Sequence, residues 1–185
     1  MDSIALRDLA HELRQPLSTI EAIAYYLALV LPPDDQKTHE QLDRLQHLVE
    51  QSNWILSNSL HLADATAPMP ERIDLDAIVV EAAAHRPGLR LELAGGCAVD
   101  ADPAMARALI DNLLTLARQS GEAATVRTRR QADGIALEVE SAAGLGSVAG
   151  GALSLASARR IVEAHGGVIE LSSEAAGARI RVVLP

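Results

Sequence analysis

The 185-residue sequence predicts an α-helical hairpin that forms a dimeric four-helix bundle, followed by an α+β sandwich of one mixed sheet with helices on one face. Two observations predict this fold. Apolar residues follow a heptad pattern in the first third of the chain, and short strands then alternate with helices. The proline-containing stretch 66–70 separates the two patterns, so we place the hairpin at residues 1–66 and the second domain at 71–185.

The first helix is expected over residues 2–31. Its apolar positions recur at alternating spacings of four and three residues, which is the pattern of a coiled seam. These positions are Leu6, Ala10, Leu13, Leu17, Ile20, Ala24, Leu27 and Leu31. The helix is expected to end at Pro32-Pro33, because proline lacks the backbone donor that a continuing helix needs.

A second helix, expected over residues 35–64, carries two apolar stripes. One stripe contains Leu42, Leu45, Val49, Ser52 and Leu56, and the other contains Leu48, Ile55 and Leu62. A hairpin of two amphipathic helices cannot bury two stripes by itself. The sequence therefore predicts a homodimer through residues 1–66.

The second domain is expected to contain strands at 72–75, 89–93, 124–130, 135–140, 168–172 and 178–184, and helices at 76–85, 103–120 and 153–165. Asp102 is the expected cap of the second of these helices, with Pro103 at its first position. Gly166-Gly167 ends the third. A loop rich in glycine, alanine and serine covers 141–151.

The composition excludes several classes of function. A formal net charge of -9 argues against a nucleic-acid partner and an anionic membrane, since both attract basic surfaces. The single cysteine, Cys97, excludes an internal disulfide and a multi-cysteine metal site, and is expected to be a small semi-buried residue. No signal peptide is visible, and no apolar run reaches the roughly 18 residues of a membrane helix. We therefore expect a soluble cytoplasmic protein without a membrane partner.

One stretch of the first helix carries candidate chemistry. His11 lies one step past Ala10 of the seam, so its imidazole is expected to face solvent. Glu12 can accept a hydrogen bond from one ring nitrogen, which would leave the other as a nucleophile. Gln15 lies four residues on, and hence on the same helix face. Pro16 costs about 3 kcal/mol inside a helix and so indicates a local kink with a purpose.

The run His-Glu-Leu-Arg-Gln-Pro-Leu at residues 11–17 resembles the H-box of sensor histidine kinases, His-Glu-Leu-Arg-Thr-Pro-Leu. Residues 102–120 resemble the N-box helix of that family, and residues 160–167 resemble the helix and turn after its second glycine box. The resemblance implies a dimerisation and phosphotransfer hairpin followed by a histidine-kinase ATPase-like domain. It also implies response-regulator receiver domains as partners.

The same resemblance implies a role for each polar residue of the motif. His11 would be the phosphoacceptor, and Glu12 the neighbouring general base or orienting group. Gln15 would occupy the place of a polar side chain that positions water for hydrolysis of a regulator's aspartyl phosphate. Arg14 would contact phosphate or the partner's acidic site, with a solvated helix charge as the alternative.

The ATP site departs from the family pattern. Asn112 matches the first asparagine of the N-box, but Leu116 stands where the second would hold magnesium, and leucine has no oxygen for that ion. Ser141 replaces the aspartate that reads adenine, and the second glycine box is reduced around Gly150 and Gly151. We expect these positions to be vestigial, with no cofactor and no metal bound.

The sequence therefore predicts a phosphorelay histidine phosphotransferase that passes phosphate between His11 and response-regulator aspartates. The start of the chain close to the hairpin favours this function over that of a sensor. Two alternatives stay open: an active sensor histidine kinase core that binds ATP and magnesium at an atypical site, and a non-enzymatic pseudokinase scaffold that binds a response regulator. A metalloenzyme is disfavoured, since His11-Glu12 lacks the second histidine of His-Glu-x-x-His.

Overall fold

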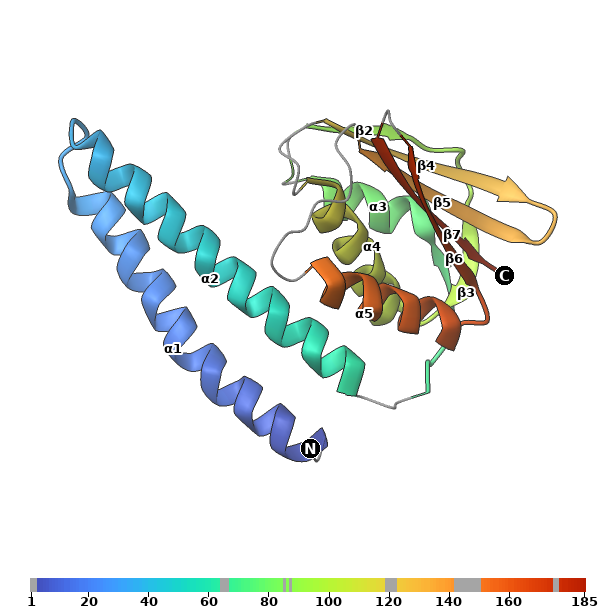
Figure 1. Cartoon of the computed structure of the whole chain (residues 1–185), viewed down its shortest axis with the longest axis horizontal. Coiled ribbons are helices and arrows are strands. Elements are labelled where there is room, and N and C mark those ends of the chain that lie inside the picture. Colours follow the sequence, from blue (N-terminus) through green and yellow to red (C-terminus); the bar gives the residue numbers. More distant parts are fainter. Residues whose placement is uncertain are drawn as a thin grey trace. The chain divides into compact units, whose positions relative to one another are not determined.

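The computed structural model describes residues 3–63, 67–84, 86, 88–118, 123–141, 151–174 and 177–185. The chain divides into two compact units, Met1–Ala65 and Thr66–Pro185. The first unit is a hairpin of helices α1 (Ser3–Val30) and α2 (Gln36–Ala63), and the second contains the sheet and the remaining helices (Figure 1). The predicted helical hairpin followed by a mixed sheet with helices is confirmed.

Local chemistry explains where the two hairpin helices end and begin. The prolines at 32 and 33 follow α1, and Asp35 then caps α2. The Asp35 carboxylate accepts a hydrogen bond from the Thr38 backbone N–H at 3.2 Å and another from the Thr38 hydroxyl at 2.6 Å. The two helices pack through small and branched side chains, since Ala10, Ala24 and Val49 are buried.

The described residues of the second unit form ten elements in chain order. They are β1 (Glu71–Asp74), α3 (Leu75–Ala83), β2 (Leu89–Glu92), β3 (Ala98–Ala101), α4 (Pro103–Arg118), β4 (Ala124–Gln131), β5 (Gly134–Ser141), α5 (Gly151–Ala164), β6 (Val168–Glu174) and β7 (Gly177–Leu184). Five of the strands form one sheet in the order β2-β4-β5-β7-β6. β2 is parallel to β4, and the other pairs are antiparallel, so the sheet is mixed. Helices α3, α4 and α5 cover one face of it (Figure 1).

Alternation along the strands separates the core from the outer face. Val126 and Ile180 point into the helix-covered core and are fully buried, whereas their neighbours Arg127 and Arg179 lie on the other face. Arg127 pairs there with Glu92 and Glu140, and Arg179 also pairs with Glu140. The outer face is therefore held by ion pairs that cross three neighbouring strand junctions, while the inner face supplies apolar contacts.

Two features of this unit differ from the sequence prediction. β1 and β3 form a separate two-stranded antiparallel sheet, and the strand Ala98–Ala101 is absent from the prediction. Its four residues are too few to show a period, and their pairing partner lies in a distant segment. Leu75 was expected to end a strand but begins α3, because the Asp74 carboxylate caps that helix through the Asp76 N–H at 3.0 Å.

The remaining predicted boundaries agree within a few residues. Ser141 belongs to β5 and Gly151 to α5, so the predicted loop 141–151 is shorter at both ends, and its residues 142–150 lie outside the described part of the chain. Residues 85 and 119–120, the expected ends of two helices, also lie outside it.

Candidate functional site

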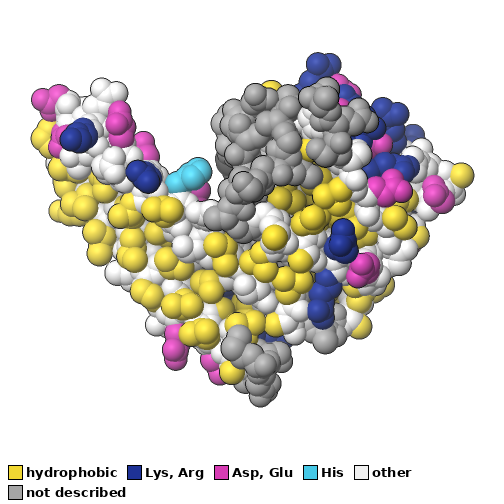
Figure 2. All heavy atoms as spheres, viewed as in Figure 1, with side chains coloured by type: hydrophobic (Ala, Val, Ile, Leu, Met, Phe, Trp, Pro, Cys, Tyr) yellow, Lys and Arg dark blue, Asp and Glu magenta, His cyan; other side chains and the backbone are white. Residues whose placement is uncertain are grey.

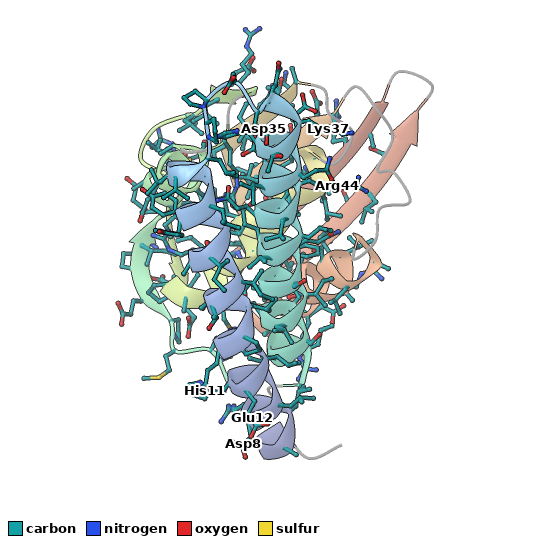
Figure 3. The ribbon with its side chains drawn as sticks, turned by 90° about the vertical axis from the view of Figure 1, so that its left-hand side faces the viewer. Asp8, His11, Glu12, Asp35, Lys37 and Arg44 are labelled. Carbon is teal, nitrogen blue, oxygen red and sulfur yellow. The ribbon has the colours of Figure 1, made fainter. Side chains whose placement is uncertain are left out.

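His11 is exposed on α1, near the N-terminal end of the helix. Figure 3 shows His11, Asp8 and Glu12 together at this end of the hairpin, whereas Asp35, Lys37 and Arg44 lie at the opposite end. The structure therefore presents the imidazole to solvent, where a partner protein can approach it.

Gln15 is the side chain that contacts the His11 ring. Its Nε2 lies 3.5 Å from Nε2 of His11, on the same face of α1, as the spacing of four residues predicts. An amide N–H can only donate, so this contact is a hydrogen bond in the tautomer that has its proton on Nδ1 and leaves Nε2 as the acceptor. In that tautomer Nε2 carries the lone pair needed for nucleophilic attack, and Gln15 must release it before attack.

Glu12 does not make the contact that its place in the sequence suggests. Its side chain is exposed, and no hydrogen bond joins it to the His11 ring among the described residues. Consecutive residues of a helix are separated by about 100° around the axis, so Glu12 leaves α1 in a different direction from His11.

Arg14 contacts the second helix of the hairpin. Its Nη2 donates a hydrogen bond of 3.0 Å to the hydroxyl of Ser57 in α2, and that hydroxyl donates in turn to the backbone oxygen of Asn53 at 3.0 Å. Ser57 carries no signal in the sequence, since it lies 43 residues from Arg14 and belongs to no motif. Arg14 therefore ties the turn of α1 that follows His11 to α2.

Pro16 lies inside α1, and the helix continues beyond it to Val30. Because proline has no N–H, the carbonyl of Glu12 lacks the helical hydrogen bond it would otherwise receive from residue 16. Thr19, one turn further on, donates its hydroxyl to the carbonyl of Gln15 at 3.0 Å. A functional kink at Pro16 stays a prediction.

Asn112, the remaining asparagine of the N-box pattern, is buried between α4 and α5. Its Oδ1 accepts a hydrogen bond from the Ser154 hydroxyl at 2.9 Å, and its Nδ2 donates to the Ser157 hydroxyl at 3.4 Å. All three side chains are almost completely buried. The amide therefore joins two helices inside the unit, where buried polar groups need such partners.

The other expected ATP-site positions also lie in the interior. Leu116 belongs to the hydrophobic core cluster, and Ser141 is buried at the end of β5 between Ala124 and Ala178. Gly151 is the first residue of α5, and Gly150 lies outside the described residues. The packed Leu116 side chain offers no oxygen to a magnesium ion, so it cannot serve as a ligand to that ion.

Within the described segments, no three or more histidine, cysteine, aspartate or glutamate side chains are grouped so that they could hold a metal ion. Cys97 is fully buried rather than semi-buried, and burial raises the pKa of its thiol. Thr128 and Asp76 lie beside it and share a hydrogen bond of 2.6 Å. This polar cluster in the core of the second unit carried no sequence signal.

Solved structures match this chain in fold. No family model matches the sequence, and no curated protein does. Among solved structures, full-length ShkA in complex with AMPPNP matches with a TM-score of 0.69 at 19% identity, over 100% of this chain and 46% of ShkA. The histidine kinase AdeS of Acinetobacter baumannii matches with a TM-score of 0.60 at 18% identity, over 94% of this chain and 96% of AdeS.

The cytoplasmic segment of the histidine kinase QseC matches with a TM-score of 0.56 at 20% identity, over 76% of this chain and 94% of that segment. This is the fold of a histidine kinase core. By fold, the hairpin of α1 and α2 corresponds to the helical hairpin of a histidine kinase core, and the second unit corresponds to its ATPase-like domain. The chain spans less than half of ShkA. No helix in the described ranges has both the length and the apolar character to span a membrane.

Proposed function

We propose that this protein is a histidine phosphotransferase of a two-component phosphorelay, with His11 as the phosphoacceptor and receiver-domain aspartates as donor and acceptor. The observation that carries the proposal is the exposed His11 ring, with Gln15 at its Nε2, on a hairpin of the histidine-kinase fold. AdeS and QseC, which share this fold, are histidine kinases. Proteins of that kind act in two-component signalling, which is why we propose that role here.

The transfer needs no reactant other than this protein and the two receiver domains. The Nε2 lone pair of His11 attacks the phosphorus of an aspartyl phosphate on one receiver. The nitrogen–phosphorus bond forms as the bond from phosphorus to the acyl oxygen breaks, and the aspartate leaves as a carboxylate. The proton on Nδ1 stays in place. The reverse sequence then delivers the phosphoryl group to the aspartate of a second receiver.

The other motif residues support this reaction in different ways. Gln15 places an amide N–H beside Nε2, where it can donate to an oxygen of the transferred phosphoryl group. Arg14 holds this turn of α1 against α2 through Ser57. Glu12 remains available as an acid or base for the partner's site, since its exposed carboxylate is not bonded to the ring.

The interior of the ATPase-like domain favours a protein phosphodonor over ATP. The metal-ligand position holds Leu116, the adenine-reading position holds a buried serine, and the Asn112 amide is engaged by α5. Three hydrogen bonds or metal contacts left unmade, each of about 1–3 kcal/mol, approach the roughly 8 kcal/mol of a micromolar complex. These residues support the proposal that the protein acts without ATP.

The protein is proposed to act as a homodimer through α1 and α2. A second stripe on α1 follows spacings of four and three residues and lies open in the single chain: Leu9, Leu13, Pro16, Ile20, Ile23, Leu27 and Val30. Its leucine, isoleucine and valine side chains are between 38% and 54% exposed. Figure 2 shows apolar side chains gathered along the visible face of the hairpin. Pairing two hairpins would bury these side chains in a four-helix bundle.

The test is phosphotransfer from receiver domains charged with acetyl phosphate to the purified full chain, followed by acid-labile phosphate on the chain. His11→Gln should abolish labelling, whereas His47→Gln, which changes an exposed histidine of α2, should not. Labelling that persists in His11→Gln would exclude this phosphotransferase. Binding of a receiver without transfer would indicate the scaffold alternative.

A calorimetric titration of the chain with magnesium–ATP separates the remaining alternative. We expect no heat of binding at micromolar nucleotide. A micromolar dissociation constant, or labelling of His11 from ATP, would instead establish an active kinase core with an atypical site.

A further inference from the structure

The closed end of the hairpin deprives backbone carbonyls of α1 of their helical donors. A carbonyl inside a helix accepts from the N–H four residues on, so Ala28 and Leu29 would need donors at positions 32 and 33. Both positions are proline, which has no N–H. One turn earlier, the Leu27 carbonyl still accepts from the Leu31 N–H at 3.0 Å. A side-chain donor that reaches such a carbonyl stabilises the end of the helix.

His39, in the first turns of α2, brings a donor to this place. Its ring is half-buried, and Nδ1 lies 2.9 Å from the backbone oxygen of Asp35, the residue that caps α2. The backbone carbonyl of Ala28 also acts on the ring as a hydrogen-bond acceptor. Asp35 marks the closed end of the hairpin in Figure 3. One imidazole thus lies between the last turn of α1 and the cap of α2.

The surroundings of this ring favour its charged form. The Asp35 carbonyl makes the largest contribution to raising the pKa of His39, and burial opposes the rise. The Ala28 carbonyl and the carboxylates of Asp35 and Asp43 raise the pKa further. The acceptors around the ring therefore outweigh its partial loss of water.

The charged groups that act on the ring come from the second helix and its cap. They are the carboxylates of Asp35 and of Asp43, which lies one turn beyond His39 in α2. Residues 22–33, which form the end of α1 and the start of the turn, contain no acidic or basic side chain. The titratable groups on that side are the phenols of Tyr25 and Tyr26.

The protonation state decides how strongly the imidazole can bind two carbonyls. The charged ring carries an N–H on each nitrogen, and each of its bonds to a carbonyl oxygen is charge-assisted. The neutral ring has a single N–H and no charge, so it binds the two carbonyls less strongly.

We propose that His39 is a proton-dependent clasp: its charged ring binds the backbone carbonyls of Ala28 and Asp35 and holds the end of α1 against the start of α2. Loss of the proton weakens the clasp. Leu27 and Val30, on either side of Ala28, belong to the apolar stripe proposed for the dimer, so the clasp also orders the end of that surface. This device goes beyond phosphotransfer and does not depend on it.

Raising the pH should loosen the hairpin. A pKa that is higher in the folded chain than in the unfolded chain means that the stabilisation is complete below the unfolded value of about 6.5. It is lost as the pH rises through the folded value, which for His39 lies above that. The hairpin should therefore be more stable near pH 5.5 than near pH 8.5, about a unit or more on either side of this range.

The first experiment is an NMR titration of the histidine rings in the full chain. We expect His39 to titrate above the ordinary histidine value of about 6.5. Pro32→Ala gives the Ala28 carbonyl a backbone donor, so this variant should lower the pKa of His39. Pro33→Ala restores a donor to Leu29 instead and is the matched control that should leave the pKa unchanged. A ring that titrates at or below the ordinary value, or an unchanged pKa in Pro32→Ala, would overturn the proposal.

The second experiment is urea unfolding of the full chain at about pH 5.5 and pH 8.5, followed by the fluorescence of Trp54 in α2. The midpoint of the unmodified chain should fall at the higher pH. His39→Gln keeps a side-chain donor but cannot titrate, so most of this difference should disappear, whereas His47→Gln on the same helix should retain it. Equal pH differences in His39→Gln and the unmodified chain would refute the clasp. If a variant fails to fold, the ring titration of the unmodified chain still decides whether the folded hairpin favours the proton.

Discussion

At the scale of single residues, Asn112 and Leu116 lie one helical turn apart in α4 and have opposite characters. The asparagine amide is buried and bonded to two serines of α5, and the leucine is packed into the core. Both side chains stabilise the ATPase-like domain through contacts inside it. Restoring one polar atom at position 116 would therefore not rebuild a nucleotide site.

Leu116→Asn tests this conclusion. Replacing a packed leucine with an amide that finds no prepared partner should lower the free energy of unfolding by about 2–4 kcal/mol. It should also leave magnesium–ATP binding undetected. Differential scanning calorimetry and nucleotide titration check the two outcomes, with Val80→Asn, at an exposed position of α3, as the control. Micromolar nucleotide binding by a stable Leu116→Asn variant would contradict the structural role.

Arg14 and Ser57 give a second prediction at this scale. If Arg14 acts through Ser57, then Arg14→Ala and Ser57→Ala should slow phosphotransfer by similar factors, and the double variant should be little worse than either. The expected coupling energy is about 0.5–1 kcal/mol. A large effect of Arg14→Ala with none from Ser57→Ala would show that Arg14 contacts the partner or its phosphate instead.

At the scale of elements, Asp102 joins the linker to the start of α4. Its carboxylate accepts from the backbone N–H groups of Ala104 and Met105 in that helix, and from Met69 before β1, each at 3.0 Å. His165 adds a link from the end of α5: its Nε2 accepts from the Asp102 N–H at 3.0 Å, and its Nδ1 donates to the carbonyl of Ile161. The ends of two helices and the linker thus meet at one residue.

Asp102 should make the free energy of unfolding depend on pH in the acid range. Burial opposes ionisation of its carboxyl, but the hydrogen bonds from Met69, Met105 and Ala104 together lower its pKa below the usual range. A pKa that is lower in the folded state means that the stabilisation is complete above the unfolded value of about 3.9 and is lost as the pH falls through the folded value. Asp102→Ala should therefore cost about 1–2 kcal/mol at neutral pH and much less once the pH lies below the folded-state pKa of Asp102.

Asp102→Asn is the matched variant. It keeps an acceptor for the helix N-terminus but cannot titrate, so most of the neutral-pH stability should remain while this acid dependence disappears. Acid unfolding followed by far-UV circular dichroism measures both. Identical acid profiles for the unmodified chain and Asp102→Asn would show that other carboxylates control the transition.

At the scale of the whole molecule, the two units are stabilised by different means. The second unit buries a continuous core between one sheet face and three helices. The hairpin contains all the tryptophan and tyrosine of the chain, which are Trp54, Tyr25 and Tyr26, and the chain has no phenylalanine. In contrast to the second unit, the hairpin leaves a stripe of apolar side chains exposed along α1. Stability of the hairpin should therefore depend on protein concentration, as it does for obligate dimers.

Ile23→Glu should disrupt the proposed dimer, because it places a charge in the middle of the exposed stripe of α1. Light scattering after size exclusion should give the mass of one chain instead of two. Leu29→Glu, at a more exposed position of the same helix outside the stripe, should remain dimeric. Intrinsic fluorescence follows the hairpin alone, since all the aromatic residues lie in it. A dimeric Ile23→Glu variant would refute the proposed interface.

The sequence by itself determined the hairpin, the order of most strands and helices, and the placing of Gln15 beside His11. These features follow from periods of a few residues and from local breakers and caps, which act within a short stretch of chain. Only the tertiary structure decided that Arg14 bonds to Ser57, that the Asn112 amide is held by α5, and that Ala98–Ala101 forms a strand. The physical reason is that each of these contacts joins residues far apart in sequence, and local spacing carries no information about such partners.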